Sequence, residues 1–170
     1  ITSGKTFFEY YDEWVKESKN RISRVTGKKL SKGTLKRYNT TKSILENFEA
    51  EAWYSINTLS MNEDFYTKFR DYIIGEKEQS VNTFSDHIKQ VKAFCKWLQK
   101  KEPSLNNDFR SFEKPFSYAD AEPLKEAELL KLYEYQATGY KEKARLIFLF
   151  LCSTGLRISD YKTLQEKNFC

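Results

Sequence analysis

The amino-acid sequence predicts an all-α protein, with a larger basic helical domain followed by a smaller helical part. Three observations support this prediction. Apolar residues recur at helical spacing through most segments of the chain. Helix-capping residues precede several of these segments. The interval 102–117 breaks every helical pattern and contains two of the three prolines, which places a linker there.

Four helices are predicted in the first domain, which we expect to span 1–104. The first covers 6–18, and a basic loop follows over 19–30. Ser31 is the predicted N-cap of a second helix that continues to about residue 50. A capping box at 60–63 opens a third helix that ends near Gly75, and a fourth covers 80–101. The fourth helix has a continuous apolar stripe made by Val81, Phe84, Ile88, Val91, Phe94, Cys95 and Leu98.

A linker over 105–117 and a second part over 118–170 are predicted next. The phenylalanines of the linker suggest that it lies against a surface. Pro123 is expected in the first turn of a helix that continues to about 136. The run from Leu146 to Leu151 is apolar on every side, so the helix over 141–154 is predicted to be buried all round. A short helix over 158–164 and the beginning of a strand at 168–170 complete the prediction.

The chain of 170 residues carries a formal net charge of +5. Residues 1–117 contain 21 basic and 16 acidic residues, whereas residues 118–170 contain eight of each. The interval 18–45 has nine basic residues and no acidic one. Because this interval runs into a patterned helix, a polyanion is the expected partner, and a solvated basic segment is the alternative.

Two helix faces carry the residues expected to bind such a polyanion. On the second helix, Lys32, Lys36, Asn39 and Ser43 fall on the side opposite the apolar positions. Ser85, Lys89, Lys92 and Lys96 form the corresponding row on the fourth helix, with Asn82 and Lys100 at its ends. Lys28 and Lys29 of the basic loop add to the same surface. Simple solvated faces would give the same pattern.

Other site classes find no support in the sequence. The only histidine, His87, lies near the edge of an apolar stripe without further ligands at metal-binding spacing. Neither a glycine-rich phosphate loop nor a nucleotide fingerprint occurs, so no metal, nucleotide or other cofactor is expected. Three cysteines without a pairing pattern, no signal peptide and no long apolar span predict a reduced, soluble, intracellular protein without membrane contact. Cys95 and Cys152 are expected in the core.

The most specific stretch is Ser-Thr-Gly-Leu-Arg-Ile-Ser-Asp-Tyr at 153–161, preceded by Leu-Ile-Phe-Leu-Phe-Leu. Gly155 is expected to end the apolar helix in a left-handed conformation. Arg157 then lies beside a helix start, where a guanidinium suits a shared phosphate. An exposed arginine paired with Asp160 is the alternative.

This stretch closely resembles the first-arginine box of the tyrosine recombinases, the phage-integrase family, whose usual form is T-G-L-R-x-S-[ED]-L. The form with Asp160 is similar to integrases of mobile elements in the Bacteroides group. Tyr161 stands where the family usually has leucine, and Lys125 where it usually has a threonine N-cap. The motif covers the last third of the chain, and the rest resembles the family's core-binding domain in pattern only.

The resemblance implies a four-helix SAM-like core-binding domain followed by the first helices of a catalytic domain, with Arg157 as the first catalytic arginine. In that family a tyrosine attacks a DNA phosphate, forms a 3′-phosphotyrosyl bond and is displaced by a 5′-hydroxyl. A parent enzyme would integrate or excise a mobile element as a tetramer on double-stranded DNA in the bacterial cytoplasm, associated with the nucleoid.

The 170 residues contain no His-x-x-Arg box and no tyrosine at the nucleophile's distance from Arg157. We therefore expect a fragment that binds DNA without catalysing strand transfer. Two alternatives remain at this point. One is a helical DNA-binding or regulatory module with no enzymatic parent, and the other is a helical protein-interaction module.

Overall fold

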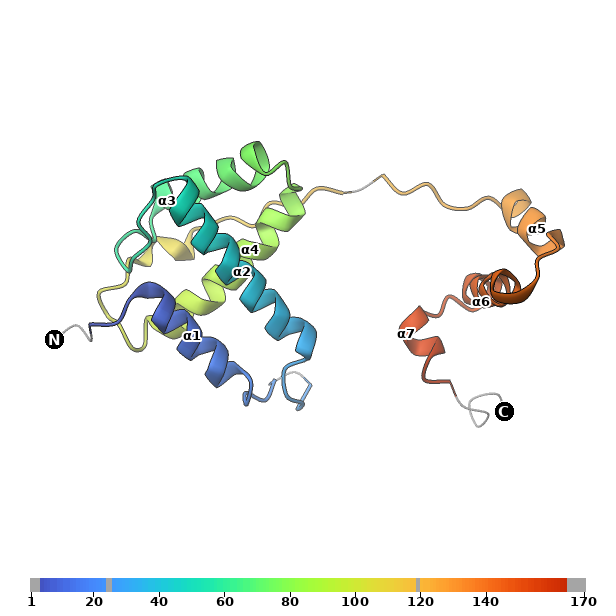
Figure 1. The fold of residues 1–170 in the computed structure, drawn as a ribbon, viewed down its shortest axis with the longest axis horizontal. Coiled ribbons are helices and arrows are strands. Elements are labelled where there is room, and N and C mark those ends of the chain that lie inside the picture. Colours follow the sequence, from blue (N-terminus) through green and yellow to red (C-terminus); the bar gives the residue numbers. More distant parts are fainter. Residues whose placement is uncertain (1–3, 24–25, 119, 165–170) are drawn as a thin grey trace. The chain divides into compact units, whose positions relative to one another are not determined.

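The computed structural model describes residues 4–23, 26–118 and 120–164, and the regular elements in these ranges are all helices (Figure 1). The predicted all-α fold is therefore confirmed. The chain divides into two compact units, Ile1–Tyr118 and Ala119–Cys170. Outside the helices, the described residues form an isolated antiparallel bridge between Ile22 and Lys29, which closes the basic loop.

The first unit contains four main helices and two short helical turns. These are α1 (Phe7–Ser18), α2 (Lys32–Glu51), α3 (Glu63–Arg70), the π-helical turn η1 (Asp71–Glu76), α4 (Val81–Leu98) and the 3₁₀ turn η2 (Asn107–Arg110). The η1 turn directly continues α3. Helices α1, α2 and α4 pack on one another, and α4 also contacts η1 and η2.

Side-chain caps explain where these helices begin. Thr6 and Glu9 form a reciprocal capping box at α1. The Ser31 hydroxyl accepts the Thr34 N–H at 3.1 Å and so caps α2, as the sequence predicts. The same arrangement, with Ser80 as N-cap, begins α4. At α3 the cap is Asn62 rather than the predicted Ser60, because its side-chain oxygen reaches the Phe65 N–H.

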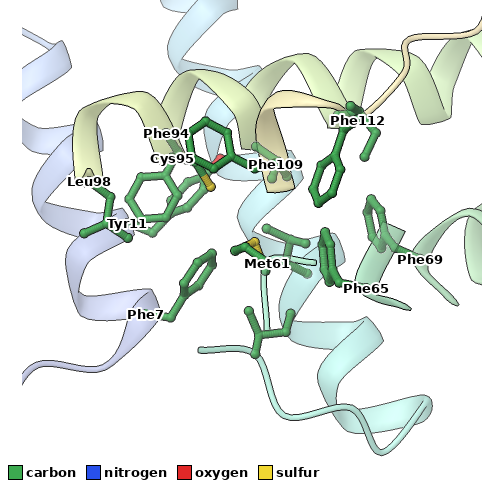
Figure 2. Packing of buried hydrophobic residues seen from close by; sticks show 14 of the residues in the cluster. Phe7, Tyr11, Met61, Phe65, Phe69, Phe94, Cys95, Leu98, Phe109 and Phe112 are labelled. Carbon is green, nitrogen blue, oxygen red and sulfur yellow. The ribbon is translucent and has the colours of Figure 1, made fainter. Parts of the chain in front are cut away.

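An aromatic core fills the first unit. Figure 2 shows Phe7 and Tyr11 of α1, Phe94 of α4 and Phe65 of α3 directed into a common space. The Phe94 ring lies 5.1 Å from the Phe7 ring and 4.7 Å from the Tyr11 ring. Burying such rings is the main contribution to folding, since each removes a large apolar area from water. The apolar stripe predicted for the fourth helix forms part of this core, apart from Val81, which lies outside it.

The segment predicted as a linker over 105–117 is largely part of the first unit. Leu105, Phe109 and Phe112 are buried in its core, and Figure 2 shows the last two beside α4. The division between the two units falls after Tyr118 instead. The prolines correctly predict an irregular backbone, but the three apolar side chains anchor it, because leaving them in water would cost about 1.5–3 kcal/mol each.

The second unit contains α5 (Glu126–Glu134), α6 (Gly139–Thr154) and α7 (Ile158–Tyr161). Helix α5 begins after Lys125, whose N–H donates to the Glu128 carboxylate at 2.8 Å, so Pro123 lies outside the helix contrary to the prediction. The Arg145 guanidinium of α6 donates to the Leu132 and Tyr133 carbonyls at the end of α5. This interaction joins the two helices.

The prediction that the helix over 141–154 is buried all round is wrong for the described residues. None of the residues of α6 is buried, because within this unit only α5 and α7 pack near it, and Leu146 and Phe148 remain exposed. Cys152 is likewise exposed rather than in the core, whereas Cys95 is buried as expected. The strand predicted at 168–170 lies outside the described residues.

Candidate nucleic-acid interface

A groove lies between the N-terminal halves of α2 and α4. The two helices touch where the Thr41 hydroxyl and His87 Nδ1 are hydrogen-bonded at 3.0 Å. Figure 1 shows their N-terminal halves separating from each other in the first unit. The space between them has a volume of about 770 Å³. Its lining consists mostly of polar and charged residues: Gly33, Lys36, Arg37, Thr40, Thr41, Ile44, Gln79, Asn82, Thr83, Asp86, His87 and Gln90.

Within the described ranges, some cations of the first unit are neutralised by carboxylates and others are not, and the unpaired ones include Lys16, Lys96 and Lys100, which do not line the groove. Away from the groove, several lysines are neutralised by carboxylates: Lys42 by Asp12 at 2.7 Å, and Lys77 by Glu51 at 2.6 Å. The cations of the basic loop and of the start of α2 have no carboxylate partner among the described residues; these are Lys28, Lys29, Lys32, Lys36 and Arg37. Unpaired charge gathered on one surface raises the local potential and attracts anions.

The helix ends at the groove add to this positive potential. Each helix carries a partial positive charge at its N-terminus, which acidic residues in the first turn commonly offset. Such residues are present in α1 and α3. The first turns of α2 and α4, the two helices that form the groove, contain none. The N-terminal ends of both groove helices therefore add to the positive potential that attracts an anion to the groove.

His87 lines the groove and is buried, whereas the sequence predicts a position near the edge of the apolar stripe. Its side chain is buried, and the Phe69 ring packs against it edge-on. Burial lowers the pKa of His87 below the ordinary value of 6.5, while the nearby Asp86 carboxylate opposes this effect. The imidazole is thus neutral in the folded protein at pH 7, and its bond to Thr41 joins α2 to α4.

Acidification should weaken the first unit through His87. Because its pKa is lower when folded, the unfolded chain takes up the proton first as the pH falls below 6.5. The free energy of unfolding then falls until the pH reaches the pKa of His87 in the folded state. The total loss is about 1.4 kcal/mol for each pH unit between the unfolded and folded pKa values. Urea unfolding between pH 7.5 and about 5.5 measures this loss, because the glutamates protonate mostly below that range. In His87→Gln the free energy of unfolding should stay flat; an equal slope in that variant contradicts the assignment.

Only some of the residues that the sequence predicts for DNA binding line the groove. Lys36 lines the groove, as does Asn82 at the end of the predicted row on α4. The other exposed members lie around it or on the outer faces of the two helices: Lys28, Lys29, Lys32, Asn39, Ser43, Lys89 and Lys96. Lys89 is paired with Asp86 at 2.8 Å. Arg24, which contributes to the basic loop in the sequence, lies outside the described residues.

Two of the predicted contacts need correction. Ser85 is only 3% exposed, so its hydroxyl is not available to a ligand. Lys92 donates to the backbone carbonyls of Arg110 and Phe112, each at 2.7 Å. These bonds hold the segment after η2 against α4, and burial together with the nearby Lys114 and Lys96 charges lowers the Lys92 pKa. Lys92 therefore has a structural role in the free protein.

Several groove residues are not predicted from the sequence as contacts, namely Arg37, Thr40, Thr83 and Gln90. Each lies one position further around its helix than the predicted row, which is a rotation of about 100°. Helical periodicity identifies the face opposite the core as the exposed one. The groove instead runs along the side where α2 and α4 face each other, and only the packing of the two helices reveals that side.

Arg157 is exposed in the second unit. Gly155 ends α6 in the left-handed conformation, with a φ of 67°, as predicted. Arg157 then occupies the N-cap of α7, and its carbonyl accepts the N–H groups of Asp160 and Tyr161. Its guanidinium forms no ion pair with the described residues, including Asp160. The side chain is therefore available to an external anion.

The described residues contain no cluster of three or more histidine, cysteine, aspartate or glutamate side chains suited to a metal ion. No helix in the described ranges has the length and apolar character needed to cross a bilayer.

The family model of the phage integrase SAM-like domain matches residues 6–131. The matched region includes α1 to α4, the groove and the first part of α5. No curated protein and no solved structure matches the chain significantly. Since the match extends over most of the 170 residues, the chain belongs to the phage integrase SAM-like domain family.

Proposed function

We propose that the chain is the DNA-binding part of a tyrosine recombinase, and that duplex DNA binds at the groove between α2 and α4. One observation carries this proposal. In a domain of the integrase family, unpaired cations, two uncompensated helix N-termini and hydrogen-bonding side chains meet at a single groove. A protein partner would not require this concentration of positive charge.

The groove residues divide into two roles. Lys36 and Arg37 bind phosphates of the DNA backbone, and Lys28, Lys29 and Lys32 extend this contact along the DNA strand. Gln90 has a side-chain amide at the groove, and this group can bond to an adenine edge in the major groove through two hydrogen bonds. Phosphate contacts would therefore provide most of the affinity and the Gln90 amide part of the sequence preference.

The recombinase activity is proposed for the whole protein rather than for these 170 residues. In this proposal Arg157 holds a phosphate oxygen while a tyrosine hydroxyl attacks phosphorus, releases a 5′-hydroxyl and leaves a 3′-phosphotyrosyl bond. Fixed cations stabilise the additional negative charge of that transition state. The exposure of Arg157 after the left-handed Gly155 supports this role. Integration or excision of a mobile element by a tetramer is part of the same proposal.

Fluorescence anisotropy with a labelled duplex of about 20 base pairs tests DNA binding directly. At physiological salt we expect a dissociation constant of roughly 10⁻⁶ to 10⁻⁴ M, the usual range for sequence-independent binding, and tighter binding at lower salt. A plot of log K against log salt should fall steeply, because several phosphate contacts release counterions. Absence of binding at low salt, or binding that salt leaves unchanged, contradicts the proposal.

The coding sequence beyond Cys170 tests the recombinase assignment. It should encode a His-x-x-Arg box and a downstream tyrosine, which the family's chemistry requires in addition to Arg157. A reading frame without them leaves a DNA-binding module with no strand-transfer activity.

A further inference from the structure

The segment that leaves the first unit is fixed to the groove by one side chain. Asn82, in the first turn of α4, donates to the Ser117 carbonyl at 2.8 Å and accepts the Ser117 N–H at 2.9 Å. This pair of bonds uses both polar atoms of the amide and both backbone groups of Ser117. Asn82 also lines the groove. The backbone at Ser117 is therefore held at the groove's edge, although it belongs to no helix.

The residues on either side of Ser117 are exposed aromatics. Phe116 is 67% exposed and Tyr118 is 88% exposed, and their rings meet edge-to-face with centroids 4.9 Å apart. Side chains two positions apart lie on the same side of an extended backbone, which accounts for this contact. The Asn82 bonds thus hold a pair of aromatic rings beside the groove, with no core residue covering them.

We propose that Phe116 and Tyr118 extend the DNA interface, with Asn82 as the positioning residue that holds them there. The inference rests on the proposed function and adds to it. The Tyr118 hydroxyl can donate to a phosphate oxygen, and both rings offer apolar surface to the deoxyribose. The bound partner is the duplex that occupies the groove, because Asn82 lines that groove and also bonds to the aromatic segment.

The inference predicts a loss of DNA affinity without a change in how that affinity depends on salt concentration. In the full chain, Phe116→Ala with Tyr118→Ala should weaken duplex binding by about tenfold, the effect of roughly one hydrogen bond and its packing. The slope of log K against log salt should stay as in the wild type, because no cation is lost. Trp53→Ala is the matched control, since Trp53 is 92% exposed but does not line the groove; its affinity should equal the wild type's.

A second variant tests the positioning role. Ser117→Pro removes the N–H that Asn82 accepts and changes no groove-lining residue. It should lower affinity as the double variant does, although both rings remain. If the wild type binds DNA and the double variant binds it with the same affinity, the inference is overturned and the proposed function stands. Absence of wild-type binding instead removes the proposed function itself.

Two further outcomes also decide against the inference. If Ser117→Pro binds as the wild type while the double variant does not, Asn82 has no positioning role. If the double variant changes self-association in sedimentation but not DNA affinity, the rings contact a second copy of the chain rather than DNA.

Discussion

Replacing Lys36 and Arg37 with glutamine should weaken duplex binding by about 100-fold at low salt. Both residues line the groove, and neither has a carboxylate partner among the described residues. Two charge-assisted hydrogen bonds to phosphate are each worth roughly 1.5 kcal/mol, which together gives this factor. The slope of log K against log salt should become shallower by about two, since each lost phosphate contact removes about 0.9. Anisotropy titrations over a series of salt concentrations measure both quantities.

Two control variants remove the same number of charges elsewhere. Lys5→Gln with Lys68→Gln affects lysines that carboxylates already neutralise, Glu13 and Asp64 respectively, and should leave the slope unchanged. Lys89→Gln with Lys96→Gln removes charge from the outer face of α4, and we expect a smaller loss than at the groove. A larger loss at Lys89 and Lys96 would place the interface on the outer face instead.

Phe94→Ala should destabilise the first unit by about 3–5 kcal/mol, the usual cost of removing a fully buried phenylalanine ring. Phe94 has no exposed surface and contacts the rings of Phe7, Tyr11 and Trp14. Since such domains are stable by only about 5–15 kcal/mol, this single change removes much of the total. Tryptophan fluorescence during urea unfolding reports on this unit specifically, because Trp14, Trp53 and Trp97 all lie in it.

Phe116→Ala is the matched control for stability. It is the same chemical change at a ring that is mostly exposed, so the free energy of unfolding should change by less than about 0.5 kcal/mol. Similar losses in the two variants would contradict the central position of Phe94 in the core.

The sequence predicts the helices of the first unit well, because two independent local signals agree there. Ser31 caps α2 as expected, and the apolar stripe of α4, apart from Val81, lies in the core. Both signals depend on residues three or four positions apart. Gly155 is predictable for the same reason, since a glycine after an apolar helix commonly ends it in the left-handed conformation.

Features that depend on contacts between distant segments are not predictable in this way. The bonds from Lys92 to the Arg110 and Phe112 carbonyls join residues about 20 positions apart, so the sequence suggests a free cation. The hydrogen bond between Thr41 and His87 similarly depends on how α2 meets α4. The groove face differs from the predicted face for this reason. Periodicity defines only the side away from the core.

The exposure of α6 has a different explanation. The apolar run from Leu146 to Leu151 predicts burial, but burial requires other elements to cover every side of the helix. Among the described residues of the second unit only α5 and α7 pack near it, so Leu146 and Phe148 stay in contact with solvent. The apolar pattern indicates that α6 is suited to a buried environment, but the described residues of this unit do not cover it.

Mapping the duplex contact by NMR tests the central claim most directly. Amide chemical shifts of the labelled chain should change on addition of duplex DNA at Gly33, Lys36, Thr40, Asn82 and Thr83, which line the groove. Residues of α3 and the outer face of α4 should change little. Shifts concentrated at Ser43, Lys89 and Lys96, with the groove unaffected, would contradict the account.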